Sequence, residues 1–493
     1  MSVAACEVYL PLLVVLPLAA AVLAVLLRER TGMWLGVGVT LVLAVLSFHL
    51  AGSVAGHGPV RYALGGWSSP LGIALYVDGL SAVMLILTSV VALAISIFSA
   101  DYFTGKKVAQ GKRFWPLWLF LIGGMNALYA SGDLFNLYVT LEIVTLSAVA
   151  MVALEGSALV LSAALRYLLL AVTGSLAYLT GVALLYSTYG SLDLVGLSEL
   201  VRPGLPTWTA LAALTVSLMM KGALFPLHVW LPPAHANAPA PVSAALSSLV
   251  VTAAFYLAAR FWGTIFAPLA QTAAIGHMLG LCGALAVLWG AFQAVRQARL
   301  KLLIAYSTVS QMGYPFLAFG LLAGRHDVAF AWGGGILFAV AHGFAKAAAF
   351  LAAGVLMAGF GHDRLKDLGG GAGRYPMAVM ALALAGVNLM GLPPSGGFVA
   401  KWMMLKAAMI SGQWPYVAVI LAGSLLAACY IFRALECTLR LAGDGPEPRG
   451  VPPRMQWAAL GLALVAVLLG HLASFPLDVL DVGVSALAGG VAP

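Results

Sequence analysis

The chain has 493 residues, of which 62% are hydrophobic and only 9% are charged. An ordinary soluble domain carries about a quarter charged residues, so this composition excludes that class. The formal net charge of +8 does not indicate nucleic-acid binding, because the basic residues are spread over short loops without a contiguous patch. The sequence therefore predicts a single integral membrane domain over residues 1–493.

Apolar windows of about 20 residues recur along the chain, and each is long enough to cross about 30 Å of hydrocarbon as a helix. They predict an all-α polytopic membrane protein with about fourteen transmembrane helices. The expected spans are about 9–28, 33–52, 77–100, 114–131, 134–153, 159–187, 207–227, 242–263, 272–293, 302–323, 328–358, 376–407, 415–438 and 456–475. An even number of spans puts both termini on one side of the membrane.

Basic residues are distributed unequally between the two sets of loops. The loops after spans one, three, nine, eleven and thirteen hold Arg28, Arg30, Lys106, Lys107, Lys112, Arg113, Arg296, Arg299, Lys301, Arg364, Lys366, Arg374, Arg440, Arg449 and Arg454. The opposite loops hold only Arg61, Arg202, Arg260 and Arg325. Cytoplasmic loops are enriched in Lys and Arg, so we expect the first set to be cytoplasmic and both termini to lie outside. Between spans two and three, residues 61–79 predict a short β-hairpin or extended loop on the outer face.

One stretch interrupts the apolar pattern. Residues 221–243, KGALFPLHVWLPPAHANAPAPVS, place Lys221 directly before a segment with five prolines. Proline removes a backbone donor and clashes with the preceding turn, so the helix that carries Lys221 should break before the next helix begins at about Val242. A lysine at bilayer depth costs about 3 kcal/mol or more, which makes Lys221 a candidate functional residue.

Few other ionisable residues lie deep within the spans. Glu142 is in span five, Lys346 in span eleven and Lys401 in span twelve. Such groups must face a partner or water, and a glutamate with several lysines but no metal or nucleophile constellation suits proton movement. The alternative is that Glu142 and Lys221 form a static ion pair that only fixes helix packing.

His342 and Lys346 are four residues apart in VAHGFAKAAAFL and so share one helix face, along which an imidazole can pass a proton to a lysine. The Gly and Ala residues around them fit tight helix packing equally well.

Two histidines lie in the Pro-rich stretch. His228 is a further relay candidate seven residues after Lys221, although Pro226 interrupts the helix between them. We expect His235 to be structural or to lie near an aqueous mouth.

Span twelve repeats the arrangement of span seven, because NLMGLPPSGGFVAKW places Pro393 and Pro394 in mid-span before Lys401. Two Pro-interrupted helices in corresponding halves are typical of an inverted-repeat transporter, whose broken helices line a cavity. We expect the first inverted repeat at about 100–263 and the second at about 272–438, flanked by helices within 1–100 and 456–475.

The four cysteines lack metal-ligand spacing, and the chain shows no haem, iron–sulfur or flavin motif. We therefore expect no cofactor and no metal site in this chain, and any redox chemistry would belong to another subunit.

Several motifs resemble the antiporter-like subunit family shared by respiratory complex I, membrane-bound hydrogenases and Mrp-type cation/proton antiporters. The resemblance covers roughly residues 60–440. It is carried by LGGWSSPLGIALYVDGLSAVML, DLFNLYVTLEIVTLSA, FPLHVWLPPAHANAPAPVSA, KLLIAYSTVSQMGY, AHGFAKAAAFLAAG and GLPPSGGFVAKW. The length and the short tail after about Phe475 are more similar to Mrp D-type and hydrogenase-type members than to the longest complex I subunit.

The resemblance implies a hydrophilic axis through the middle of the membrane. Glu142 would match the fifth-helix glutamate that pairs with the seventh-helix lysine, Lys221. Lys401 would match the twelfth-helix lysine at the exit side, and His342 and Lys346 would lie on the eleventh helix near the crossover.

One position departs from the family. Thr252 stands on the eighth helix where these proteins commonly carry a lysine or histidine. A hydroxyl orients water but holds no titrating proton near neutral pH. A continuous path would then run through water and His342 or Lys346, or the chain works with one half-channel.

The resemblance implies a proton-translocating subunit of a multisubunit complex in a bacterial inner membrane. Its partners would be other membrane subunits, the lipid bilayer, protons and Na⁺ or another cation. The leading interpretation is the D-type subunit of an Mrp-type cation/proton antiporter. The alternatives are a proton-pumping subunit of a hydrogenase or NADH/ferredoxin:quinone oxidoreductase, and a non-pumping scaffold whose axis is broken at Thr252.

Overall fold

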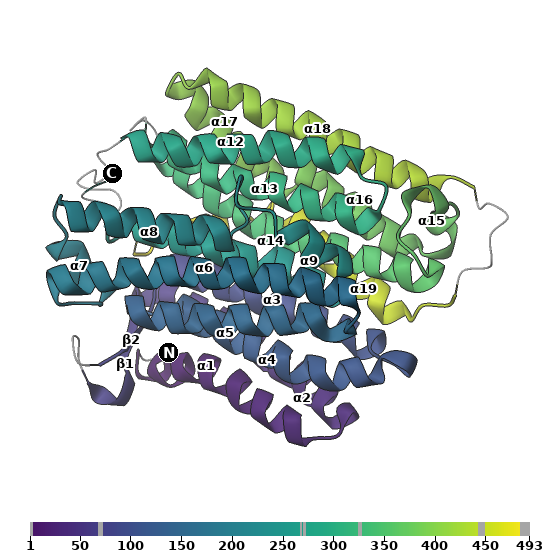
Figure 1. The fold of residues 1–493 in the computed structure, drawn as a ribbon, viewed down its shortest axis with the longest axis horizontal. Coiled ribbons are helices and arrows are strands. Elements are labelled where there is room, and N and C mark those ends of the chain that lie inside the picture. The colour runs from purple at the N-terminus through teal and green to yellow at the C-terminus, as the bar shows by residue number, and fades with distance from the viewer. Residues whose placement is uncertain are drawn as a thin grey trace.

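The computed structural model describes residues 3–67, 72–266, 269, 273–323, 328–441 and 449–483. Its long helices lie alongside one another in a bundle (Figure 1). The first part contains α1 (Val3–Leu26), α2 (Glu29–His57), α3 (Gly79–Tyr102), α4 (Val108–Ala130), α5 (Leu134–Val152), α6 (Ala158–Tyr189), α7 (Leu194–Leu200), α8 (Leu205–Lys221), α9 (Leu231–Asn237), α10 (Ala240–Ala245) and α11 (Val251–Gly263). The second part contains α12 (Ala273–Arg296), α13 (Leu300–Ala323), α14 (Val328–Phe360), α15 (Gly371–Arg374), α16 (Pro376–Met390), α17 (Gly396–Ile410), α18 (Trp414–Leu439), α19 (Pro453–Leu468) and α20 (Ser474–Leu480).

The predicted all-α polytopic fold is confirmed. Nine helical segments of the described chain are long and apolar enough to cross a membrane. The other predicted spans correspond to α4, α13, α19 and the two interrupted pairs α8–α9 and α16–α17. These elements are shorter, broken or more polar, which suits helices that present polar groups inside a bundle.

The predicted hairpin is also present. Strand β1 (Val60–Ala63) pairs antiparallel with β2 (Ala74–Val77), so that Val60 lies opposite Val77. Figure 1 places the hairpin and α7 at the same end of the bundle. At this end the Gly79 amide donates a 2.9 Å hydrogen bond to the Val482 carbonyl, which ties the segment after α20 to the start of α3. Arg325 and residues 68–71 of the hairpin turn lie outside the described residues.

The seventh span breaks at the predicted place, but its helix resumes earlier than predicted. α8 ends at Lys221, and residues 222–230 form turns. The prediction that no helix resumes before about Val242 is wrong. α9 lies entirely before Val242, and α10 already begins at Ala240. Each of these short helices begins with proline at its first or second position, where the missing N–H has no intrahelical partner to lose.

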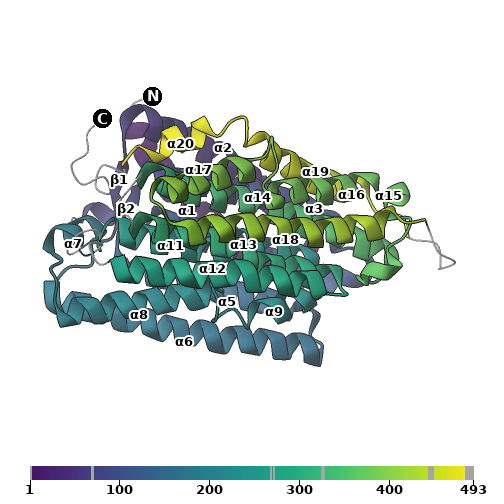
Figure 2. The same cartoon turned by 90° about the horizontal axis from the view of Figure 1, so that it is seen from above.

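The central helices are shielded from the bundle surface. Every residue in the apolar windows of Ala240–Gly263 and Val328–Phe360 is buried. α14 packs against α3, α10, α13, α16, α17 and α19, whereas Figure 2 shows α6 and α8 side by side along one edge. A π-helical turn at Leu246–Val250 joins α10 to α11. The division into repeats at about 100–263 and 272–438 stays a prediction.

Candidate functional site

The first group of buried ionisable side chains lies where α8 ends. Lys221 is the last residue of α8, and its Nζ is 3.2 Å from Oε1 of Glu142 on α5. The same ammonium donates to the Thr145 hydroxyl at 3.1 Å, one turn along α5. From α6, the Ser175 hydroxyl donates to Glu142. The pair suggested by the sequence is therefore present and is enclosed by three helices.

The break in the helix favours an ammonium at this place. Carbonyl groups at a helix C-terminus carry partial negative charge, so a cation in the last turn is stabilised. The indole N–H of Trp230 donates to the Met220 carbonyl at 2.8 Å, which satisfies one group that the break sets free. Tyr167 stacks on this indole with ring centroids 4.1 Å apart. The residues after the break thus hold the end of α8 in place.

Thr252 lies on α11 and is buried. Its hydroxyl has no hydrogen-bond partner among the described residues, and the same holds for Ser217, one turn before Lys221 on α8. Both hydroxyls can orient water, but neither exchanges a proton near neutral pH. The structure therefore places only a hydroxyl at this buried position of α11.

The second group of ionisable side chains lies on the central helix α14. Lys346 donates to the Ile304 carbonyl at 2.8 Å and to the Ser307 hydroxyl, both on α13. Within the described part of the chain no carboxylate forms a salt bridge with it. His342 lies one turn earlier, and neither of its ring nitrogens makes a hydrogen bond of normal geometry to a described residue. This lysine is thus held only by neutral groups, whereas Lys221 has a counter-charge.

Lys401 completes the series on α17. Its ammonium donates to the Leu389 and Met390 carbonyls, at 2.9 Å and 3.3 Å, which are the last two residues of the broken helix α16. It also lies 5.7 Å from the centroid of Phe338, whose ring stacks on His342 at 6.4 Å. Phe338 therefore lies between the lysine at the second break and the histidine of α14.

Gly391 allows Lys401 to approach α16, and its replacement gives a first prediction. It ends α16 with φ of +78°, and a Cβ there would lie 2.6 Å from Cδ of Lys401. We expect Gly391→Ala to lower the thermal unfolding midpoint through backbone strain of about 1 kcal/mol and overpacking of about 1–3 kcal/mol.

Gly412→Ala is the matched control for this prediction. Gly412 has φ of +68°, and nothing lies within 4 Å of an added Cβ. Its replacement by alanine therefore introduces backbone strain but no overpacking. Equal midpoints for the two variants, measured by thermal unfolding in detergent, would contradict the proposed close approach of Lys401.

His228 stands apart from the other candidates. Its ring stacks on Phe225 with centroids 5.5 Å apart, on the segment between α8 and α9. None of its described contacts joins it to Lys221 or to the α14 group. The structure brings the other sequence candidates onto buried faces of α5, α8, α11, α14 and α17, but not into one contiguous chain of hydrogen bonds.

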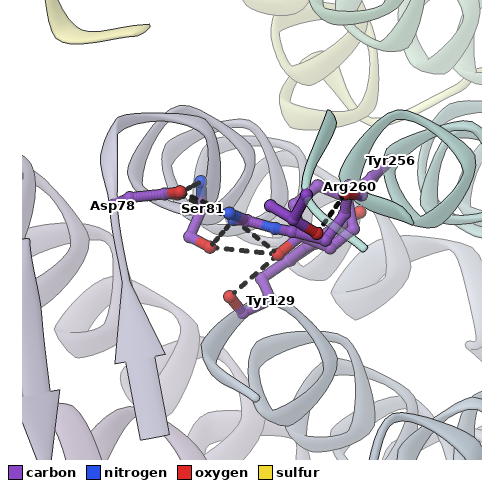
Figure 3. A network of polar contacts seen from close by, with 6 residues as sticks. Asp78, Ser81, Tyr129, Tyr256 and Arg260 are labelled. Carbon is purple, nitrogen blue, oxygen red and sulfur yellow. Dashed lines mark hydrogen bonds and ion pairs between the residues drawn. The ribbon is translucent and has the colours of Figure 1, made fainter. Parts of the chain in front are cut away.

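A buried ion pair at the hairpin end was not predicted. The sequence assigns Arg260 to an outer loop, and this is wrong, because it lies buried on α11. Figure 3 shows its guanidinium between Asp78, Ser81 and Tyr256. Nη2 donates to Oδ1 of Asp78 at 2.7 Å, to the Ser81 hydroxyl at 2.8 Å and to the Tyr256 hydroxyl at 3.1 Å. An arginine four residues after a tyrosine in an apolar span is the signal that could have suggested a carboxylate partner.

Asp78 has two roles at this end of the bundle. Its Oδ1 accepts the Ser81 amide at 3.0 Å and so caps the start of α3. Burial alone would raise the pKa of the Asp78 carboxyl. The charge and hydrogen bonds of Arg260 outweigh burial and hold this pKa below its ordinary value. The carboxylate is therefore kept ionised in a buried place.

The structure corrects the prediction for Lys301 and places His235, which was expected to be structural or near an aqueous mouth. Lys301 was expected in a cytoplasmic loop but is the second residue of α13 and is buried, with its ammonium donating to the Ala238 carbonyl. His235, at the end of α9, is completely buried. Their burial depends on helices distant in sequence, so local patterning gave no signal for it.

Fold and site together define a polytopic membrane protein with buried ionisable groups beside two broken helices. No group of His, Cys, Asp and Glu suited to a metal ion occurs among the residues that the structure describes. Residues 131–427 match the family described as "NADH:quinone oxidoreductase/Mrp antiporter, TM", and residues 67–111 match "NADH-Ubiquinone oxidoreductase (complex I), chain 5 N-terminus". The chain belongs to the NADH:quinone oxidoreductase/Mrp antiporter transmembrane family, as its motifs indicated.

Three similar proteins illustrate the range of this family. NADH-quinone oxidoreductase subunit N of Desulforudis audaxviator is 34% identical over 458 residues, which cover 90% of each chain. The D-type subunit of the Na(+)/H(+) antiporter of Alkalihalophilus pseudofirmus is 31% identical over 78% of this chain and 77% of the relative. A chain in the solved Mrp complex from Dietzia sp. DQ12-45-1b superposes with a TM-score of 0.88 at 24% identity, covering 98% of this chain and 97% of that chain. The last likeness concerns the fold alone.

Proposed function

We propose that the chain translocates protons as one subunit of a multisubunit membrane complex. The observation that carries this proposal is the buried Lys221 ammonium, which has one carboxylate partner, Glu142, at the end of a broken helix. An ammonium that loses its counter-charge in a site of low dielectric constant releases its proton more readily. Opening and closing of the pair would therefore change the proton affinity of Lys221, as a switch requires.

The remaining candidates would extend the path through the membrane. Lys346 and His342 on α14 lie between the two broken helices in sequence, and Lys401 lies at the second break. Thr252 would contribute only a hydroxyl that orients water, and His228 would act at the first break. The π-helical turn just before Thr252 supports a functional role for this region, because such turns occur frequently at functional sites.

The complex most consistent with these features is an Mrp-type cation/proton antiporter, with this chain as its D-type member. Support comes from the 31% identity to the D-type subunit of an Na(+)/H(+) antiporter. The second candidate is the proton-pumping membrane arm of a redox complex, which the 34% identity to an NADH-quinone oxidoreductase subunit N favours. In either case the protein would assemble with other membrane subunits.

We infer that the protein lies in a bacterial inner membrane with both termini outside. The loops after the predicted spans one, three, nine, eleven and thirteen are rich in Lys and Arg. Such loops remain in the cytoplasm. The hairpin and α7 would then face outward.

The direct test is proton movement by the complete complex. The chain is purified with its companion subunits and reconstituted into vesicles that contain a pH-sensitive dye. For an antiporter, a Na⁺ or K⁺ pulse without electron donor changes the internal pH. For a redox pump, only an electron donor with its acceptor, such as NADH with a quinone, has this effect. A well-assembled complex that moves no protons under either condition would overturn the proposal.

A further inference from the structure

A large cavity lies at the end of the bundle that carries the basic loops. It has a volume of about 820 Å³. Chain segments far apart in sequence line it, including the start of α4, the end of α9, the start of α13 and the start of α19. Exposed side chains such as Lys106 and Arg449 lie along its lining, so the cavity opens to the aqueous phase.

Lys301 connects this cavity to the interior. It is 1% exposed as a residue, yet it belongs to the cavity lining. Its ammonium donates to the carbonyl of Ala238, between α9 and α10. Among the described residues no carboxylate forms a salt bridge with Lys301, and Asp363 is bound by Arg299 at 2.9 Å. Lys301 is therefore a buried cation at the floor of a water-accessible space.

His235 on α9 lies three residues before Ala238, whose carbonyl accepts from Lys301. The carbonyl of His235 accepts from the Ser243 hydroxyl at 3.1 Å, and its ring stacks on Phe350 of α14 with centroids 4.8 Å apart. Neither ring nitrogen has a hydrogen-bond partner among the described residues. A completely buried imidazole without partners loses both hydrogen bonds that water would provide, which a structural role alone does not explain.

Two lysines lie near His235. Lys301 binds the Ala238 carbonyl three residues after His235, and Lys346 lies one turn before Phe350, on which the His235 ring stacks. Lys301 belongs to the cavity wall, and Lys346 belongs to the candidate path on α14. The imidazole thus lies near both a lysine of the cavity wall and a lysine of the candidate path.

We propose that Lys301 and His235 form a proton-uptake site that connects the cavity to Lys346. In this step a proton from water in the cavity, passing by way of Lys301, binds one ring nitrogen of His235. The other ring nitrogen releases its proton to the neutral amine of Lys346, directly or through one water molecule, and the imidazole returns to its neutral form. No atom or charge is left over, because one proton enters and one leaves.

This uptake site bypasses Thr252. A route from Lys221 across α11 meets a hydroxyl that holds no proton near neutral pH. A route from the cavity through His235 reaches α14 without using α11. The inference rests on the proposed function, since it assumes that protons move through Lys346, but it concerns separate residues that can be tested separately.

The test uses the complete complex in vesicles and compares rates of proton movement. His235→Phe keeps a ring that can stack on Phe350 but removes both nitrogens. Lys301→Arg keeps the positive charge but cannot release a proton. We expect each variant to assemble normally and to translocate protons about a hundredfold more slowly, the lower range for loss of a positioned proton-transfer group.

Matched controls come from the same types of residue elsewhere. His277 is exposed on α12, and Lys106 is exposed in the cavity lining. His277→Phe and Lys106→Arg should both retain the wild-type rate. A cysteine in place of Asn237, which also lines the cavity, should react with a membrane-impermeant maleimide added on the side of the basic loops.

The outcomes separate this inference from the proposed function. Wild-type rates in both His235→Phe and Lys301→Arg, in a complex that Lys221→Met inactivates, would overturn the uptake site and leave the proposed function standing. Failure of the Asn237 cysteine to react from that side would also overturn it. A wild-type complex that moves no protons would overturn the proposed function and this inference together.

Discussion

Replacement of Lys221 by methionine abolishes proton translocation while the complex still assembles. Methionine keeps a long side chain of similar shape but removes the one ammonium among the described residues that forms a salt bridge with Glu142. We expect the rate to fall by at least about a hundredfold, because the group that would hold the proton is lost. The measurement is dye-reported proton movement in vesicles, with complex assembly followed on native gels.

A second lysine provides the control for this prediction. Lys406 also lies on a membrane helix, α17, where its ammonium sits 3.9 Å from the ring centroid of Phe330 without a carboxylate partner given by the structure. Lys406→Met should keep the wild-type rate. A similar loss in both variants would show that removal of any membrane lysine harms the complex, and the special role of Lys221 would be contradicted.

The static-pair interpretation makes a different prediction from the switch. If Glu142 and Lys221 only fix helix packing, the double variant Glu142→Gln/Lys221→Met should translocate protons normally, because replacing both partners of a buried pair is often close to neutral. Under the switch, the double variant assembles but stays inactive. The single variants should also differ in stability. Glu142→Gln leaves a lysine that is 6% exposed without its counter-charge, whereas Lys221→Met leaves a glutamate that is 20% exposed and still bound by Ser175.

The broken helices were predictable from the sequence because their causes are local. Proline cannot continue a helix interior, so the prolines after Lys221 and before Lys401 mark both interruptions. The prolines did not predict how many residues each interruption would contain. α9 resumes with its prolines in the first turn. The residue before it, Trp230, stacks on Tyr167 of α6, a contact between segments far apart in sequence that local patterning does not show.

The partners of buried charges were harder to predict, since they come from distant parts of the chain. Arg260 and Asp78 are 182 positions apart, and their pairing depends on how α11 packs beside α3. The burial of Lys301 likewise depends on α13 starting against a distant loop, where the Leu300 amide donates to the Asp363 carbonyl at 2.7 Å. Glu142 was already a possible partner of Lys221 from the few ionisable residues in the spans, and the resemblance to a family made this pair the expected one.

Loss of the Asp78 carboxylate is the change with the largest expected effect on stability. Asp78→Asn keeps an oxygen that can cap α3 but leaves the Arg260 guanidinium buried without an opposite charge. Breaking a buried pair in this way costs about 3–5 kcal/mol. We expect a strongly lowered thermal unfolding midpoint in detergent and a reduced amount of protein in the membrane. The double variant Asp78→Asn/Arg260→Met should recover most of the loss, because no uncompensated charge remains.

A surface ion pair at the same end of the bundle provides a control for the stability loss expected of Asp78→Asn. The guanidinium of Arg61 contacts Asp193 at 2.7 Å, but Arg61 is 44% exposed, whereas Arg260 is 5% exposed. Arg61→Ala should therefore lower the free energy of unfolding by no more than about 1 kcal/mol.

Because Arg260 lowers the pKa of Asp78, the Asp78–Arg260 pair stabilises the fold at neutral pH, and this contribution is lost as the pH falls below the ordinary carboxyl value of about 4. The midpoint difference between wild type and Asp78→Asn should thus be full at pH 7 and shrink in acid, and a difference that is the same at both pH values would contradict an ionised Asp78.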